Sequence, residues 1–215
     1  MPEKKIDIPS PTHETDTYVR IGGDFERVFD GEDYLAMVNS LDEVSVVLRA
    51  HLVLEEFLNI WCDRVTGANS LFGKIFVPFK IKLAIAQNLG FATEYAKIFD
   101  KFNEIRNGYS HKRKYALQQE TLNSIKNKVN ALSSTPPWRP CEELGIFAEG
   151  SDQSGQRQKI QYEWASCDIK KRLLLVFIPL VMKLTQWMQS EFDRRGIEYT
   201  LVAKLDGMEN KNPEA

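Results

Sequence analysis

The stretch NEIRNGYSHKRKY, residues 103–115, combines side chains that bind phosphate with one that transfers protons. Arg106 and Asn107 are adjacent, and His111 follows five residues after the arginine. A guanidinium binds two phosphate oxygens at once, and an imidazole accepts or releases a proton near neutral pH. These residues therefore have the types needed for proton transfer beside a phosphate. The structural alternative is that cations near a helix C-terminus stabilise its dipole and that Gly108 unwinds the chain.

A run of cations, Lys112, Arg113 and Lys114, follows the histidine directly. The whole chain has 28 Lys and Arg against 30 Asp and Glu, a net charge of −2. Bulk positive charge therefore gives no argument for nucleic-acid binding, and only a local patch remains. The three cations could guide an RNA backbone, although a solvated basic turn explains the same run.

Composition indicates one well-buried domain. The 215 residues are 43% hydrophobic and 27% charged, which is ordinary for a globular chain. The three cysteines have no paired spacing, so we expect free thiols and neither a zinc site nor a disulfide framework. Paired metal-binding histidines, a Ser or Cys nucleophile constellation and a phosphate-binding glycine loop are not recognisable, and we expect no metal and no cofactor.

Nearly every periodic segment has a helical period. Ser40 and Glu43 have capping-box spacing ahead of an apolar run that predicts a helix to about Val65. Its apolar residues lie nearly all round, so we expect this helix at the centre of the core. Further helices are predicted at 73–89, from Thr93 to the Arg-His stretch, at 117–132 and at 168–195. Asp168 is the predicted cap of the last helix and Gly196 its stop.

These elements predict a single all-α domain over residues 23–196, with a flexible arm at 1–22 and a tail at 197–215. Residues 133–167 are proline-rich and then polar, and we expect a connection and loop there, with at most a short pair of strands. The run from Leu173 to Met182 is about ten residues, roughly half of a membrane span. It predicts a buried helix of a cytoplasmic protein with no membrane contact, and the N-terminus lacks the apolar stretch of a signal peptide.

The segment FNEIRNGYSH resembles the signature of the HEPN superfamily. That signature is an arginine, a polar residue and a histidine four to six residues beyond the arginine, at the end of a core helix. Arg106, Asn107 and His111 match it position by position. The order of LRAHLVLEEFLNIW, FGKIFVPFKIKLAIAQNLG and YAKIFDKFNEIRNGYSH is similar to the mannitol-operon repressor (MltR-like) branch. The resemblance covers roughly residues 40–132, and the long C-terminal helix is an addition to it.

This resemblance implies a helical bundle that dimerises with two Arg-His motifs facing each other across a cleft. In catalytic members that cleft cuts RNA without a metal. His111 would then be the base or acid, Arg106 the phosphate clamp, and Asn107 the residue that orients one of them. One toxin branch carries a tyrosine two residues after the histidine, which a partner modifies. Here that position is Arg113 and the nearest tyrosine is Tyr115, which argues against control by such an antitoxin.

Two glutamates in the apolar helix, Glu55 and Glu56, need partners if they are buried. We expect one of them to contact Arg106 and fix its guanidinium. His51 and Glu55 are four residues apart and share a face, and we interpret them as a core pair.

Three function classes remain. The first is a metal-independent endoribonuclease, a toxin or defence element acting on single-stranded or loop RNA. The second is a non-catalytic MltR-like transcriptional regulator or partner-binding protein, in which the same residues form a structural and dimer-forming core. The third is an RNA-binding module without cleavage. The predicted partners are RNA, a second copy of the chain, and an antitoxin or regulatory protein. No helix pair has helix-turn-helix character, so direct operator binding is not expected.

Overall fold

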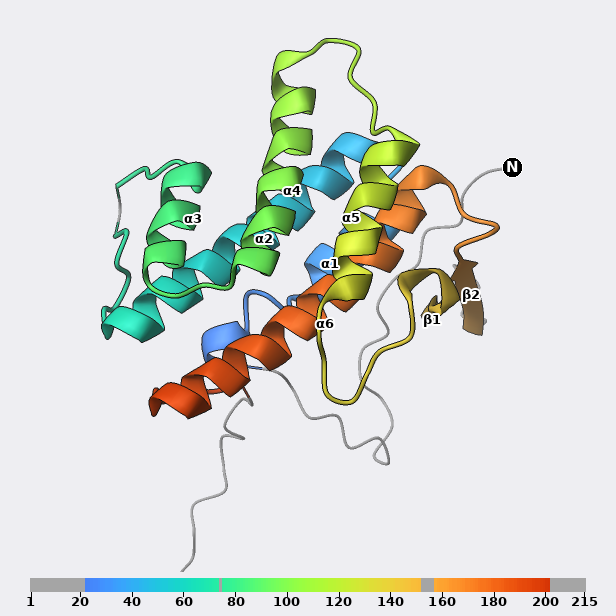
Figure 1. Cartoon of the computed structure of the whole chain (residues 1–215). Coiled ribbons are helices and arrows are strands. Elements are labelled where there is room, and N and C mark those ends of the chain that lie inside the picture. The colour runs from blue at the N-terminus through green and yellow to red at the C-terminus, as the bar shows by residue number, and fades with distance from the viewer. Residues whose placement is uncertain (1–21, 74, 152–156, 202–215) are drawn as a thin grey trace, which may run out of the picture.

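The structure is a computed structural model, and it describes residues 22–73, 75–151 and 157–201, without the side chains of 146–160. In these residues the chain forms an all-α bundle with one small hairpin, which confirms the predicted fold class (Figure 1). The helices are α1 Gly31–Asn39, α2 Glu43–Thr66, α3 Phe79–Asn88, α4 Thr93–His111, α5 Gln119–Ala131 and α6 Ile169–Arg195. Short 3-10 turns lie at Gly23–Phe25 (η1) and Cys141–Glu143 (η2).

Helix α2 is the centre of the bundle, as its composition predicted. It packs against α1, α3, α4 and α6. The large aromatic side chains that are fully buried come from α2, α4, α6 and η1, and they include Trp61, Phe57, Phe99, Phe102, Phe177, Phe192 and Phe25. Burying this aromatic and aliphatic surface is the main force that holds the helices together. One row on the outer side of α2 nevertheless remains exposed, which the sequence did not predict.

The cap of α2 differs from the predicted capping box. Asp42, not Ser40, is the N-cap, and its carboxylate accepts a hydrogen bond from the Ser45 N–H at 2.7 Å. The carboxylate is a better acceptor than the Ser40 hydroxyl, and Glu43 is then free to turn toward another element. The predicted caps of α6 are confirmed: the Asp168 carboxylate accepts from the Lys171 N–H at 2.9 Å, and Gly196 ends the helix with a left-handed φ of 66°.

One helix boundary was wrong, one suggested break in a helix does not occur, and one helix was missed. Helix α3 begins at Phe79 rather than near Gly73, because Pro78 is its N-cap and keeps the residue before it extended. Helix α4 continues through Gly108 to His111, so this glycine does not unwind the chain. Helix α1, with Asp30 as its cap, was not predicted because its nine residues are shorter than the window of about 11–18 residues in which a helical period is recognised.

The expected short strand pair is confirmed in the connection between α5 and α6. Strands β1 (Gly145–Ser151) and β2 (Arg157–Glu163) are antiparallel, with Gly145 opposite Glu163. Nearby, the buried Lys183 of α6 donates hydrogen bonds to two carbonyl oxygens at the end of α5, those of Val129 and Leu132, each at 3.0 Å. This lysine is the donor to the Leu132 carbonyl and a second donor to the Val129 carbonyl, which also accepts from the Leu132 N–H at 3.2 Å.

The first residues of the predicted tail belong to the domain. The Gly22 N–H donates to the Leu201 carbonyl at 2.9 Å, and the Asp24 N–H donates to the Thr200 carbonyl at 3.0 Å. Tyr199 packs edge to face on Phe25. The predicted arm before Gly22 and the tail after Leu201 lie outside the described residues.

Helix α6 is long and apolar enough to cross a membrane by length and composition alone. In the bundle, 67% of its most apolar window is buried against the other elements. The side chains of Leu173, Val176, Phe177 and Leu180 are all buried, so the predicted burial of this run is confirmed.

Candidate functional site

The last two turns of α4 carry the Arg-His motif at one end of the bundle, at the top of Figure 1. The Arg106 guanidinium donates from Nη1 to Asn107 Oδ1 at 3.1 Å. Asn107 and His111 are one turn apart and share a face of the helix. Arg106 and Asn107 are partly exposed and His111 is exposed, so all three side chains are accessible to a ligand.

Gly108 allows the chain after α4 to fold back on the helix. A Cβ at this position would lie 2.5 Å from the ring of Tyr115, far inside van der Waals contact. The Tyr115 ring therefore rests directly on the glycine, and it packs edge to face on Tyr109 with the ring centres 4.7 Å apart. The turn between α4 and α5 is held against the motif by these contacts.

Hydrogen bonds also connect this turn to the start of α2. The Tyr109 hydroxyl donates to the Glu43 carboxylate. The Leu117 N–H donates to Tyr109 Oη at 3.0 Å and to Glu43 Oε2 at 3.2 Å. Burial, reinforced by the hydrogen bond to Glu43, raises the pKa of Tyr109, so its hydroxyl remains protonated. Tyr109 is therefore a packed, hydrogen-bonded residue, and Glu43, which the sequence assigned to a local cap, is its partner.

The side chains of the basic turn lie outside this group of hydrogen bonds. Lys112, Arg113 and Lys114 are exposed, and among the described residues none of them forms an ion pair. The Lys112 ammonium lies 5.9 Å from the centre of the Tyr115 ring, near the limit of a cation–π contact. With Arg106, these residues concentrate positive charge at one end of a nearly neutral chain.

Beneath Arg106, a buried histidine links α2 to α4. His51 is only 6% exposed, and its Nε2 lies 3.4 Å from Oδ1 of the buried Asn103, one turn before Arg106. Its ring packs on Phe79 of α3 with the centres 4.3 Å apart. Burial lowers the pKa of His51, the Arg106 charge adds to this effect, and Asn103 and Glu55 oppose it. His51 therefore stays neutral near pH 7, and its hydrogen-bond partner is Asn103 rather than the predicted Glu55.

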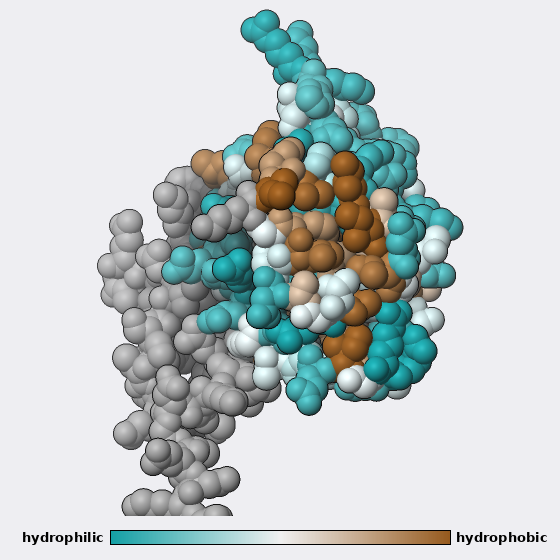
Figure 2. Space-filling model, turned by 90° about the vertical axis from the view of Figure 1, so that its left-hand side faces the viewer, coloured by the Kyte–Doolittle hydropathy of each residue, from teal (hydrophilic) through white to brown (hydrophobic). Residues whose placement is uncertain are grey.

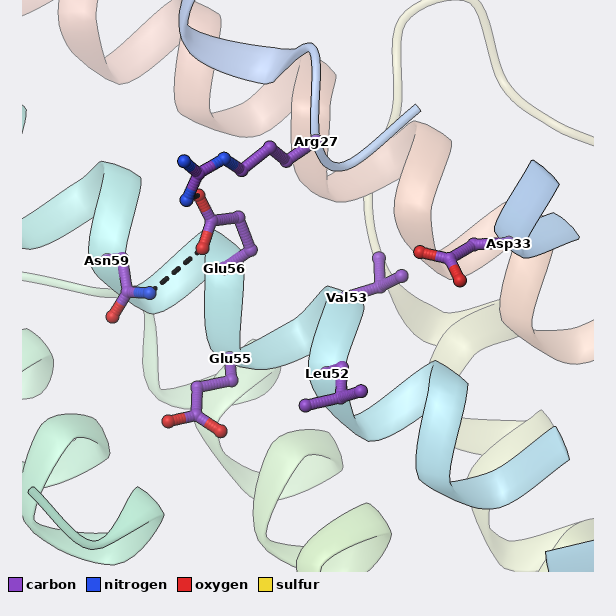
Figure 3. Close-up of a pocket in the computed structure, with 7 residues that line it drawn as sticks. All are labelled: Arg27, Asp33, Leu52, Val53, Glu55, Glu56 and Asn59. Carbon is purple, nitrogen blue, oxygen red and sulfur yellow. Dashed lines mark hydrogen bonds and ion pairs between the residues drawn. The ribbon is translucent and has the colours of Figure 1, made fainter. Parts of the chain in front are cut away.

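The predicted contact of Glu55 or Glu56 with Arg106 was wrong. Glu55 forms an ion pair with Lys82 of α3 at 2.8 Å. Glu56 accepts a hydrogen bond from Asn59 at 2.9 Å, and its other oxygen lies 3.8 Å from Arg27 (Figure 3). Neither carboxylate pairs with Arg106 within the described part of the chain.

The arrangement of α2 and α4 explains this outcome. Tyr109 contacts Glu43 and Asn103 contacts His51, so the two helices run antiparallel. Arg106 is halfway between Asn103 and Tyr109 in α4. It therefore lies level with Val47, which is halfway between Glu43 and His51 in α2. At about 1.5 Å per residue, Glu55 is roughly 12 Å further along α2 and cannot reach the guanidinium.

A shallow pocket of about 320 Å³ lies on the outer side of α2, between this helix and the N-terminal segment (Figure 3). Its lining residues are Arg27, Asp33, Leu52, Val53, Glu55, Glu56 and Asn59. The charged groups are paired, Asp33 with Arg49 and the two glutamates as described above. Among the described residues, no group of three or more His, Cys, Asp or Glu side chains is arranged to hold a metal ion.

Comparison with protein-family models, with curated proteins and with solved structures found no match to this chain. The functional interpretation therefore rests on the residues and on the geometry of the site.

Proposed function

We propose that this chain is a HEPN-like, metal-independent endoribonuclease that works as a cytoplasmic homodimer and cuts single-stranded or loop RNA. The observation that carries the proposal is the end of α4. Arg106, Asn107 and His111 are accessible on its last two turns, and the guanidinium is hydrogen-bonded to Asn107 at 3.1 Å. The basic turn lies directly beside them, where it can bind the backbone on either side of a cut phosphate.

The chemistry needs only groups that the chain provides. A neutral His111 takes the proton from a ribose 2′-hydroxyl, and the 2′-oxygen attacks the adjacent phosphorus. The bond from phosphorus to the 5′-oxygen breaks, and a protonated imidazole gives its proton to that oxygen. The products are a 2′,3′-cyclic phosphate and a 5′-hydroxyl. Arg106 binds the non-bridging oxygens and stabilises the additional negative charge of the transition state.

A second copy of the chain supplies the second proton-transfer group. Each copy has one exposed histidine at its motif, because His51 is buried and hydrogen-bonded to Asn103. A base and an acid are both required, so two copies of His111 complete the site. This is the arrangement that the HEPN resemblance implies.

The alternative is a non-catalytic, MltR-like regulator that binds a protein partner. The observation that favours it is the loop between α2 and α3, where Ile75 and Phe76 are 79% and 88% exposed. A contiguous exposed apolar patch often marks an interaction site, and these two exposed side chains are adjacent in the chain. In that reading the Arg-His residues have only a structural role.

The test is cleavage of a labelled single-stranded RNA by the purified protein in the presence of a chelator. We expect wild-type cleavage to leave 2′,3′-cyclic phosphate ends, and an RNA with 2′-deoxy sugars throughout to stay intact. His111→Ala should lose at least about 100-fold in rate, the usual contribution of a general acid or base. Ser110→Ala is the matched control, since within the described part of the chain its exposed hydroxyl bonds only the Arg106 carbonyl of its own helix.

The same experiment separates the alternatives. If the wild type binds RNA without cutting it, the chain is an RNA-binding module. Absence of both binding and cutting would favour the regulator. Cleavage that His111→Ala retains would show a contaminating nuclease or a different site, and would contradict the proposal.

A further inference from the structure

The half-buried Glu43 carboxylate lies beside the basic turn, yet it does not pair with the cations there. Its Oε2 accepts hydrogen bonds from the Tyr109 hydroxyl and from the Leu117 N–H, the second at 3.2 Å. Among the described residues, Glu43 forms no ion pair, and the cations of the basic turn form none either. Opposite charges that lie close together attract one another. A carboxylate and three cations nevertheless share this end of the molecule without neutralising each other.

The cations of the turn are close enough to reach this carboxylate. The Lys112 ammonium lies 5.9 Å from the centre of the Tyr115 ring, and that centre lies 4.7 Å from the centre of the Tyr109 ring, whose hydroxyl binds Glu43. Burial raises the pKa of Tyr115, and the charges of Glu104 and Glu43 add to this effect. Because the four-carbon stem of a lysine is flexible, Lys112 can turn toward a carboxylate that is free to meet it.

The Tyr109 hydroxyl is the group that holds the carboxylate in place. Burial keeps this hydroxyl protonated, so it donates to Glu43, and it also accepts the Leu117 N–H at 3.0 Å. Glu104, the other carboxylate near Tyr115, is paired with Lys101 at 2.6 Å. The turn itself forms the hydrophilic projection at the top of the molecule in Figure 2, above the apolar side chains on the α3 side. Its cations are therefore exposed and available to a ligand.

From these contacts we propose that Tyr109 is a positioning residue for RNA. By binding the Glu43 carboxylate, it prevents Glu43 from neutralising the basic turn, and the cations of residues 112–114 stay available to the phosphate backbone. The inference rests on the proposed function in taking RNA as the ligand, but it concerns binding and not proton transfer by His111. Without the hydroxyl, Glu43 pairs with one cation and the RNA loses one phosphate contact.

The size of this loss follows from the salt dependence of phosphate contacts. For a single strand, each contact contributes about 0.7 to the slope of log affinity against log salt concentration. One contact is therefore worth about fivefold in affinity between 1 M and 0.1 M salt. The same contact also changes the slope, which a general loss of stability would leave unchanged.

The test is binding of a labelled single strand with 2′-deoxy sugars throughout, measured by fluorescence anisotropy from about 0.05 to 0.2 M salt. Contacts to phosphate do not read the sugar, and the proposed chemistry cannot cut this strand. Tyr109→Phe should bind about fivefold more weakly than the wild type at 0.1 M salt, with a slope smaller by about 0.7. Adding Glu43→Gln to Tyr109→Phe should restore both values, because the amide carries no charge that could neutralise a lysine.

Tyr95→Phe is the matched control. The Tyr95 hydroxyl donates to the Lys183 carbonyl at 2.9 Å, and Tyr95 lies on the same helix about 21 Å from Tyr109. This variant loses a hydroxyl hydrogen bond away from the basic turn, so it should bind the strand with wild-type affinity and slope. Circular dichroism verifies that every variant keeps the helical fold.

Several results overturn the proposal. If Tyr109→Phe binds as tightly as the wild type, Glu43 does not reach the cations. A loss that Glu43→Gln does not restore, or that Tyr95→Phe shares, would mean that the tyrosine acts through the fold alone. A wild type that does not bind the strand would show that the basic turn does not serve a phosphate backbone. Failure of the proposed function is a different outcome, in which binding responds as expected but ordinary RNA is not cut.

Discussion

Replacing Gly108 by alanine tests how the motif is built, because two effects of known size oppose each other there. Alanine is favoured over glycine inside a helix by about 1 kcal/mol. The added Cβ, however, would lie 2.5 to 2.8 Å from three ring atoms of Tyr115. Forcing an extra methyl group into a packed site costs about 1–3 kcal/mol. The ring cannot simply rotate away, since it also packs on Tyr109.

We therefore expect Gly108→Ala to lower the free energy of unfolding by about 1 kcal/mol, the middle of the overpacking cost less the helix gain. In a Tyr115→Ala background the clash is absent, and the same substitution should raise the free energy of unfolding by about 0.5–1 kcal/mol. The change of sign between the two backgrounds is the signature of direct contact.

The assay is urea unfolding followed by circular dichroism, with thermal unfolding as a second measure. For a chain of this size, 1 kcal/mol corresponds to a shift of about 2–4 °C in the melting temperature. Each Gly108→Ala protein is compared with its own parent, so the cost of Tyr115→Ala itself cancels. Equal stabilisation in both backgrounds would refute the reasoning, because the Tyr115 ring would then not lie on Gly108.

Three further predictions concern the elements around the site and the core. Asp42→Ala should lower the free energy of unfolding in urea by about 0.5–2 kcal/mol, because its carboxylate caps α2. Ser40→Ala should lower it by less. A larger loss for Ser40→Ala than for Asp42→Ala would favour the predicted capping box instead. Burial holds the pKa of His51 below its ordinary 6.5, so the unfolded chain binds this proton more readily. The free energy of unfolding should therefore fall as the pH drops below 6.5, and His51→Gln should weaken this pH dependence. A His51→Gln variant with the same pH dependence as the wild type from pH 5 to 7 would contradict the prediction. Lys183→Met should lower the free energy of unfolding in urea by about 1–3 kcal/mol, because the Leu132 carbonyl loses its donor and the Val129 carbonyl keeps only the Leu132 N–H. A neutral result would mean that the cost of burying the charge offsets both hydrogen bonds.

Much of the fold could be read from local patterns. The apolar periods predicted the long helices, and Asp168 and Gly196 were correctly placed at the ends of α6. These features depend on residues within a few positions of each other, which interact whatever the rest of the chain does. Before α2 the capping-box pattern indicated Ser40, whereas the structure has Asp42 as the cap. Helix α1 is short, and packing against α2 and α6 stabilises it more than its own sequence does.

The candidate site divides in the same way. Arg106, Asn107 and His111 share the last turns of one helix, so their proximity follows from spacing alone. The contacts between side chains of different helices do not follow from spacing. Glu55 was expected on Arg106, but the relative position of α2 and α4 along their axes puts it beside Lys82 instead. The hydrogen bond from His51 to Asn103 spans 52 residues of sequence, and no local pattern indicates it.

What the sequence by itself determined is therefore the helical class of the chain, the main helix ends and the grouping of the Arg-His motif. Each of these depends on contacts within one or two helical turns. Only the tertiary structure decided that Glu43 ties Tyr109 and the basic turn to α2, that Gly108 receives the Tyr115 ring, and that a row through Leu48 stays exposed on the central helix. These features depend on how far the helices slide and rotate against one another. Many side chains far apart in the sequence set that packing jointly, so no single segment encodes it.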